Sequence, residues 1–89
     1  MNTFKLIISS PDGNKFEGEA VKLDVRGVEG ELAVMAGHIP FVTSLVNCPC
    51  TVLLDNDTEL KGYTEGGLLT VGSDSVTLLS SSFKFEKED

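Results

Sequence analysis

The feature that most constrains this sequence is the strict alternation of apolar and polar residues in short runs. From Val21 to Arg26, apolar residues at 21, 23 and 25 alternate with charged residues at 22, 24 and 26. Residues 4–9 follow the same pattern, with Ile7 as the one apolar residue on the polar side. Since successive side chains of a strand point to opposite faces, this period of two predicts strands with one buried and one wet face.

Turn-forming residues separate these runs at intervals of about eight to twelve residues, a spacing that is typical of sandwiches. Proline, glycine, aspartate and asparagine cluster at 11–14, 55–57, 66–67 and 72–74. No stretch of twelve or more residues shows the spacing of a surface helix. We therefore predict an all-β fold, a two-sheet antiparallel β-sandwich of about ten short strands.

Length and charge limit the classes of function. A chain of 89 residues is one domain. We expect this domain to span residues 1–85, followed by a charged tail at 86–89. The net charge of −7 argues against binding nucleic acid through a basic face and against docking onto anionic lipid by charge. There is no apolar run long enough to insert into a bilayer and no signal peptide, so we expect a cytosolic compartment.

The sequence contains no recognisable catalytic motif. His38 is the only histidine, and the motifs G-x-S-x-G, G-x-G-x-x-G and the phosphate-binding P-loop are all missing. Asp55, Asp57 and Glu59 resemble the start of a calcium loop, but Leu60 stands where that loop requires glycine. We therefore expect a protein that is not an enzyme and holds no cofactor or metal.

The segment Cys48-Pro49-Cys50 leaves one alternative open. A small metal or redox protein could use both thiols with His38, but structural zinc needs four ligands and a disulfide across one residue is strained. We interpret the segment as two inert thiols on either side of a turn proline.

The most unusual stretch is 27–41, where three glycines and a proline impose an irregular course. It carries Glu29, Glu31 and His38 close to apolar Met35 and Phe41. Carboxylates beside methionine and aromatic groups suit a contact with another protein. A structural corner whose polar groups face water would have the same composition, so both interpretations stand at this point.

The pattern Gly-x-x-Gly-Glu-Leu-x-Val-x-x-Gly-His-x-Pro-x-x-Thr-x-Leu, at 27–45, closely resembles the epsilon subunit of F-type ATP synthases. Residues 4–20 and 65–79 resemble the first hairpin and the closing strands of that family. The resemblance implies a ten-stranded β-sandwich in the central stalk, between the gamma subunit and the membrane c-ring. Its expected role is non-catalytic: it couples proton or sodium flow to ATP synthesis, peripherally at the cytoplasmic face of a bacterial plasma membrane.

The resemblance also implies contact residues. The end loop would face the c-ring with Glu29, Glu31 and His38. The strand that follows would lie against gamma with Phe41, Val42, Thr43 and Leu45. Tight docking onto gamma predicts an exposed apolar patch.

The sequence departs from the family in two places. Nothing after Leu79 resembles the family's C-terminal helical hairpin, so nucleotide binding is not expected. Cys48-Pro49-Cys50 stands where relatives commonly have a Pro-Gly turn. A free-standing β-sandwich adaptor that binds some other protein through the same loop is the alternative function.

Overall fold

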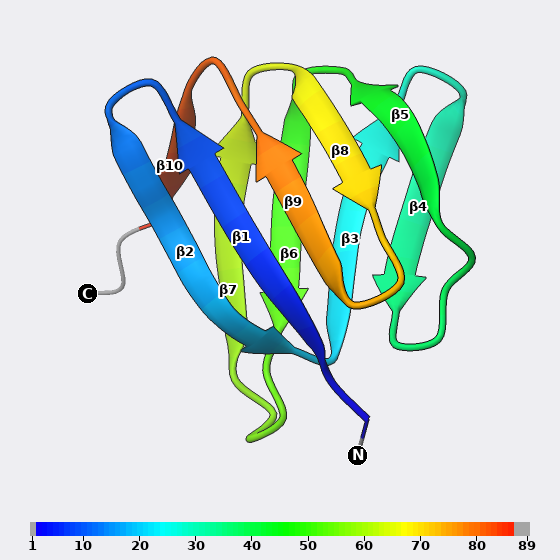
Figure 1. Ribbon diagram of the computed structural model, residues 1–89. Helices are drawn as coiled ribbons and strands as arrows, with labels where there is room; N and C mark the ends of the chain where they lie inside the picture. The colour runs from blue at the N-terminus through cyan, green and yellow to red at the C-terminus, as the bar shows by residue number, and fades with distance from the viewer. Residues whose placement is uncertain (1, 87–89) are drawn as a thin grey trace.

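The structure, a computed structural model, describes residues 2–86, and every regular element in that range is a strand (Figure 1). The ten strands are β1 (Phe4–Ser10), β2 (Gly13–Ala20), β3 (Lys22–Gly27), β4 (Gly30–Met35), β5 (Phe41–Leu45), β6 (Cys48–Leu53), β7 (Glu59–Thr64), β8 (Gly67–Val71), β9 (Ser75–Leu79) and β10 (Phe83–Phe85). The predicted all-β class and the predicted strand number are confirmed.

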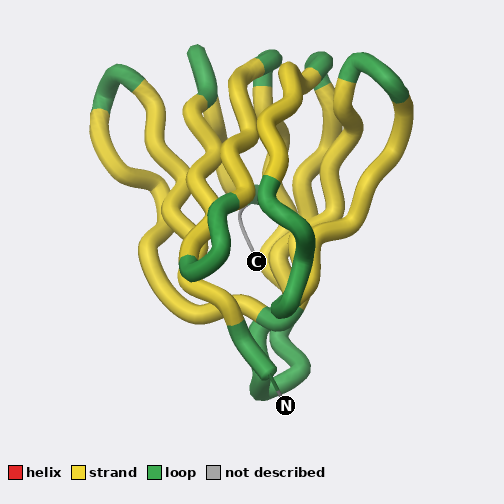
Figure 2. The backbone as a smooth tube through the Cα atoms, turned by 45° about the vertical axis from the view of Figure 1, so that its right-hand side comes forward, coloured by secondary structure: helices red, strands yellow, loops and turns green. Residues whose placement is uncertain are grey.

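The strands form one hydrogen-bonded path in the order β10-β7-β6-β3-β5-β8-β9-β1-β2, with β4 attached to β3. The path folds into two layers, with β1, β2, β8 and β9 in front of β3, β6 and β7 (Figure 1). Strand β3 joins the layers, because Lys22–Asp24 pair with β6 whereas Gly27 pairs with Leu45 of β5. The result is a barrel-like sandwich whose turns gather at the two ends of the strands (Figure 2).

One strand pair differs from the antiparallel prediction. Strands β1 and β9 are parallel, with Lys5 opposite Ser75 and Ser9 opposite Leu79. These strands lie far apart in the sequence and share no hairpin turn, so no local signal determines their relative direction. All other strand pairs of the described residues are antiparallel, including every pair that a hairpin joins.

The core follows the predicted alternation. Leu6, Ile8, Leu23 and Val25 are buried, whereas Ile7 is only partly buried. The two ends of the strand path, β2 and β10, meet through side chains: the Phe16 and Phe85 rings lie 6.5 Å apart, edge to face. Aromatic packing therefore closes the core between β2 and β10, which no ladder of backbone hydrogen bonds connects in the described part of the chain.

The turns lie where the turn-forming residues predict them, except at the cysteines. Cys48, Pro49 and Cys50 begin strand β6 and do not form a turn. Both thiols point into the core and Pro49 points out, as the period of a strand requires. Pro49 is tolerated because the β3 ladder ends at Thr51, so its missing N–H is not needed on that side.

The backbone pairing of the sandwich extends to Glu86, just beyond the predicted end of the domain at residue 85. The Glu86 backbone N–H donates to Lys61 O at 2.7 Å, which extends the pairing between β10 and β7. The other residues of the predicted tail, 87–89, lie outside the described residues.

Leu23→Ala provides a test of the core. Leu23 is completely buried, so we expect the substitution to lower the free energy of unfolding by about 2–5 kcal/mol. Urea denaturation measures this change, and Val28→Ala on an exposed turn is the matched control. A cost for Leu23→Ala no larger than that of the control would contradict the inward orientation of this strand.

Candidate functional site

The structure gathers nearly all of the predicted contact residues around one hollow. A hollow of about 340 Å³ is lined by Glu29, Glu31, His38, Phe41, Val42 and Thr43, together with Gly27, Gly30 and Leu32. It forms because β4 is bonded to β3 while β5 is bonded along its length to β8, so the two strands diverge. Of the predicted residues, only Leu45 lies elsewhere, in the core.

The hairpin between β3 and β4 supplies the carboxylates. Gly27 pairs with Gly30, which leaves Val28 and Glu29 as the turn, and Gly30 has φ +126°, a conformation that glycine adopts readily. The Val28 N–H donates to Ser44 O at 3.0 Å, which ties the turn to β5. Glu29 is therefore presented at the tip of a fixed hairpin.

Glu31 does not stand alone. It lies directly opposite Arg26, and Arg26 Nη2 donates to Glu31 Oε2 at 2.6 Å. The two side chains are 56% and 76% exposed, so the pair contributes at most about 1 kcal/mol to stability.

The loop between β4 and β5 supplies the histidine. The His38 ring packs 5.3 Å from the Phe41 ring, at a tilt of 50°. Nδ1 lies 3.3 Å from Ile39 O, close enough for a hydrogen bond, and the Ile39 side chain is exposed. Within residues 2–86, no three His, Cys, Asp or Glu side chains gather as a metal-holding group, and His38 lines a different hollow from Cys48.

Strand β5 divides the residues expected to meet gamma. Val42 points outward, Phe41 and Thr43 are half-buried at the hollow, and Leu45 is buried. Since side chains alternate along a strand, one partner surface cannot touch all four side chains equally.

A second surface starts at Val42, and most of it was not predicted from the sequence. Strand pairing places two rows side by side across β5, β8, β9 and β1, namely Val42-Thr70-Thr77-Ile7 and Ser44-Leu68-Leu79-Ser9. We call these eight residues the neutral face, because none carries a charge. Val42, Leu68 and Leu79 are 61%, 40% and 49% exposed. The signal in the sequence was the doublets Leu68-Leu69 and Leu78-Leu79, in which one leucine must point outward.

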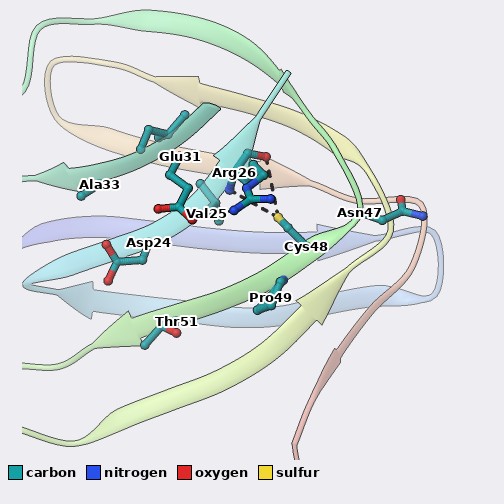
Figure 3. Close-up of a pocket in the computed structure, with 10 residues that line it drawn as sticks. Asp24, Val25, Arg26, Glu31, Ala33, Asn47, Cys48, Pro49 and Thr51 are labelled. Atoms are coloured by element: carbon teal, nitrogen blue, oxygen red, sulfur yellow. Dashed lines mark hydrogen bonds and ion pairs between the residues drawn. The ribbon is translucent and has the colours of Figure 1, made fainter. Parts of the chain in front are cut away.

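Cys48 lines a second hollow, of about 530 Å³, between β3, β4 and β6 (Figure 3). Cys48 Sγ accepts the Arg26 N–H at 3.4 Å and lies 3.7 Å from Arg26 O, to which the thiol donates. The thiol thus bonds to the backbone of Arg26 at the point where the pairing between β3 and β6 has ended. Both cysteines are free and buried, and burial is the main reason why the pKa of Cys50 is raised to about 12, followed by the nearby Cys48 and Asp24.

The raised pKa of Cys50 predicts a loss of stability in alkali. An unfolded thiol ionises near pH 9 and the buried one near pH 12, so the folded state binds more protons between these values. The contribution of this thiol to the free energy of unfolding is complete below about pH 9. Between pH 9 and pH 12 it falls by at most about 1.4 kcal/mol for each pH unit. Urea denaturation from pH 8 to 11 measures the slope. We expect a Cys50→Ala variant to lose less stability with rising pH than the unchanged chain does. An equal slope in both proteins would contradict the assignment of this pH dependence to Cys50.

The sequence matches a known family over nearly all of its length. The family described as "ATP synthase, Delta/Epsilon chain, beta-sandwich domain" matches residues 3–86. The chain belongs to the epsilon-chain family of F-type ATP synthases. It is 36% identical to the ATP synthase epsilon chain of Wolbachia pipientis wMel, over 94% of this chain and 74% of the relative. It is 30% identical to that of Brevibacillus brevis, over 92% of this chain but only 62% of the relative.

Chains in solved ATP synthase structures have the same fold. A chain of the Euglena gracilis mitochondrial ATP synthase, from a complex of OSCP, F1 and c-ring, superposes with a TM-score of 0.88 at 20% identity, covering 93% of this chain and 53% of that chain. A chain of the Tetrahymena thermophila central stalk and c-ring superposes with a TM-score of 0.78 at 11% identity, covering 93% and 66%. No helix in the described residues is long and apolar enough to cross a membrane.

Proposed function

We propose that the chain is a non-catalytic rotor-stalk subunit of an F-type ATP synthase, which links gamma to the c-ring and so couples proton or sodium movement to ATP synthesis. One observation carries this proposal. The neutral face and the 340 Å³ hollow are two chemically different surfaces that meet along β5, where Val42 belongs to both. A subunit held between two partners needs two such surfaces.

Gamma docks on the neutral face. The outer face of the opposite layer carries four cations, at Lys22, Arg26, Lys61 and Lys84. Burying those charges against a partner would cost far more than burying the neutral face. Within the predicted gamma set, Val42 makes the contact, Phe41 and Thr43 border it, and Leu45 supports the strand from the core.

The c-ring docks at the hollow, through Glu29, Glu31 and His38. All three are exposed, and their hairpin and loop are linked to β5 by the Val28–Ser44 hydrogen bond and by the His38–Phe41 ring contact. A force applied to either surface passes directly into the sandwich, whose layers share one core and one continuous hydrogen-bonded path. Torque transfer requires this stiffness.

The position of the subunit follows from these partners. It is peripheral, at the cytoplasmic face of a bacterial plasma membrane, and its contact with the membrane sector is to protein and not to lipid. The β-sandwich of residues 1–85 performs this role without binding a nucleotide or nucleic acid.

Co-purification tests the proposal. An affinity-tagged complete chain is expressed in its own bacterium, and the solubilised membrane complex is isolated and weighed by native mass spectrometry. We expect one copy of the chain with gamma and the c-ring. Recovery of some other protein with neither subunit would favour the adaptor function and overturn the proposal.

A further inference from the structure

We propose that Arg26 is a positioning residue for the contact that Glu31 makes, an inference that rests on the proposed function. The guanidinium holds the carboxylate in one orientation at the hollow, so that a partner meets a prearranged group. Arg26 was not among the predicted contact residues.

The backbone of Arg26 is unusually well anchored. It lies where β3 leaves β6 and approaches β5, between the pairs Asp24–Thr51 and Gly27–Leu45. There the Cys48 thiol bonds both its N–H and its carbonyl, and the Val46 N–H donates to the same carbonyl at 3.2 Å. The side chain therefore starts from a fixed point, between Glu31 and Cys48 (Figure 3), although it is 56% exposed.

The side chain of Arg26 determines which carboxylate oxygen of Glu31 is available to a partner. Glu31 lines both hollows, so it stands on the ridge between them. The bond to Arg26 uses Oε2, and the second oxygen, Oε1, bonds to none of residues 2–86, so it can accept a hydrogen bond from a donor on the partner. A free glutamate would lose side-chain freedom on binding, and the ion pair reduces this entropic cost in advance.

Stability does not explain the pair, because exposed ion pairs add little to the free energy of unfolding. This separates positioning from a structural role: removing the guanidinium should change binding and leave folding nearly unchanged. Lys22 provides a matched control. It lies on the same face of β3, is 40% exposed against 56% for Arg26, and pairs with Asp24 at 3.7 Å. Unlike Glu31, however, Asp24 does not line the 340 Å³ hollow.

The test measures the affinity of the complete chain, assembled with gamma, for detergent-solubilised c-ring. We expect Arg26→Gln to weaken binding roughly 3- to 10-fold at an unchanged melting temperature, and Arg26→Lys to keep more than half of the affinity. Lys22→Gln should bind as the unchanged chain does. In a Glu31→Gln background, adding Arg26→Gln should cause no further loss.

Three results would overturn the inference. If Glu31→Gln weakens binding but Arg26→Gln does not, positioning is wrong and the proposed contact stands. If Arg26→Gln weakens binding equally with and without Glu31, Arg26 touches the partner directly. If Glu31→Gln leaves the affinity unchanged, the Glu31 contact in the proposed function fails, and the positioning role fails with it.

Discussion

Gly67→Ala is expected to destabilise the fold more than any other single methyl group added to a described glycine. Gly67 begins β8 with φ +131°, and a Cβ atom there would lie 2.4 Å from the Leu79 carbonyl oxygen. That oxygen belongs to the β9 backbone, so relief of the clash would require β8 and β9 to separate. These strands carry Leu68 and Leu79 of the neutral face, so the proposed docking surface depends on this glycine.

Gly13→Ala separates the clash from the backbone strain. Gly13 has nearly the same φ, +129°, but a Cβ atom there would meet nothing within 4 Å. We expect Gly13→Ala to lower the free energy of unfolding by about 1–3 kcal/mol, because of the unfavourable φ alone. Gly67→Ala should lower it by at least about 2 kcal/mol more. Urea denaturation of both variants measures the difference. Equal costs would show that β8 and β9 are not packed as closely as the structure has them.

Leu68→Glu is expected to abolish tight association with gamma while the sandwich stays folded. Leu68 lies between Ser44 and Leu79 in one row of the neutral face. Docking would bury the new carboxylate without a partner, which should weaken the affinity by at least about 30-fold, or 2 kcal/mol. Because the side chain is already 40% exposed, we expect the free energy of unfolding to change by no more than about 1 kcal/mol.

Tyr63→Glu is the control for that experiment. Tyr63 is 48% exposed in the opposite layer, between Pro49 and Lys84. The Tyr63→Glu substitution introduces the same charge as Leu68→Glu, but on the face that we do not assign to gamma. Binding of each variant to purified gamma is measured by calorimetry. A larger loss for Tyr63→Glu than for Leu68→Glu would assign gamma to the wrong face of the sandwich.

The strands and their inward residues could be predicted because they depend on local alternation. Leu23 and Val25 are buried as the pattern from Val21 to Arg26 indicates, and the carboxylates, the histidine and β5 do meet at one site. These features are read from neighbours in the sequence or from a motif that spans less than twenty residues. The physics involved is the two-residue period and the conformational freedom of glycine.

The features that could not be predicted depend on contacts between distant segments. The proline between Cys48 and Cys50 indicated a turn, but the β3–β6 ladder ends beside it and a strand can accommodate it. The direction of β9 relative to β1 has no local signal. The neutral face needs the register of four strands before Val42 and Leu79 are known to share a surface. The bond between Cys48 and Arg26 likewise exists only after folding.

Site-directed cross-linking tests the central claim, two partners on two surfaces, most directly. Single cysteines replace Glu29 at the hairpin tip and Thr70 on the neutral face, and a thiol-reactive photo-cross-linker is attached in the assembled membrane complex. Cys48 and Cys50 are almost completely buried, so the unchanged chain should give little background. We predict that Glu29→Cys links to the c subunit and that Thr70→Cys links to gamma. Links from both positions to one partner, or to neither subunit, would contradict the account.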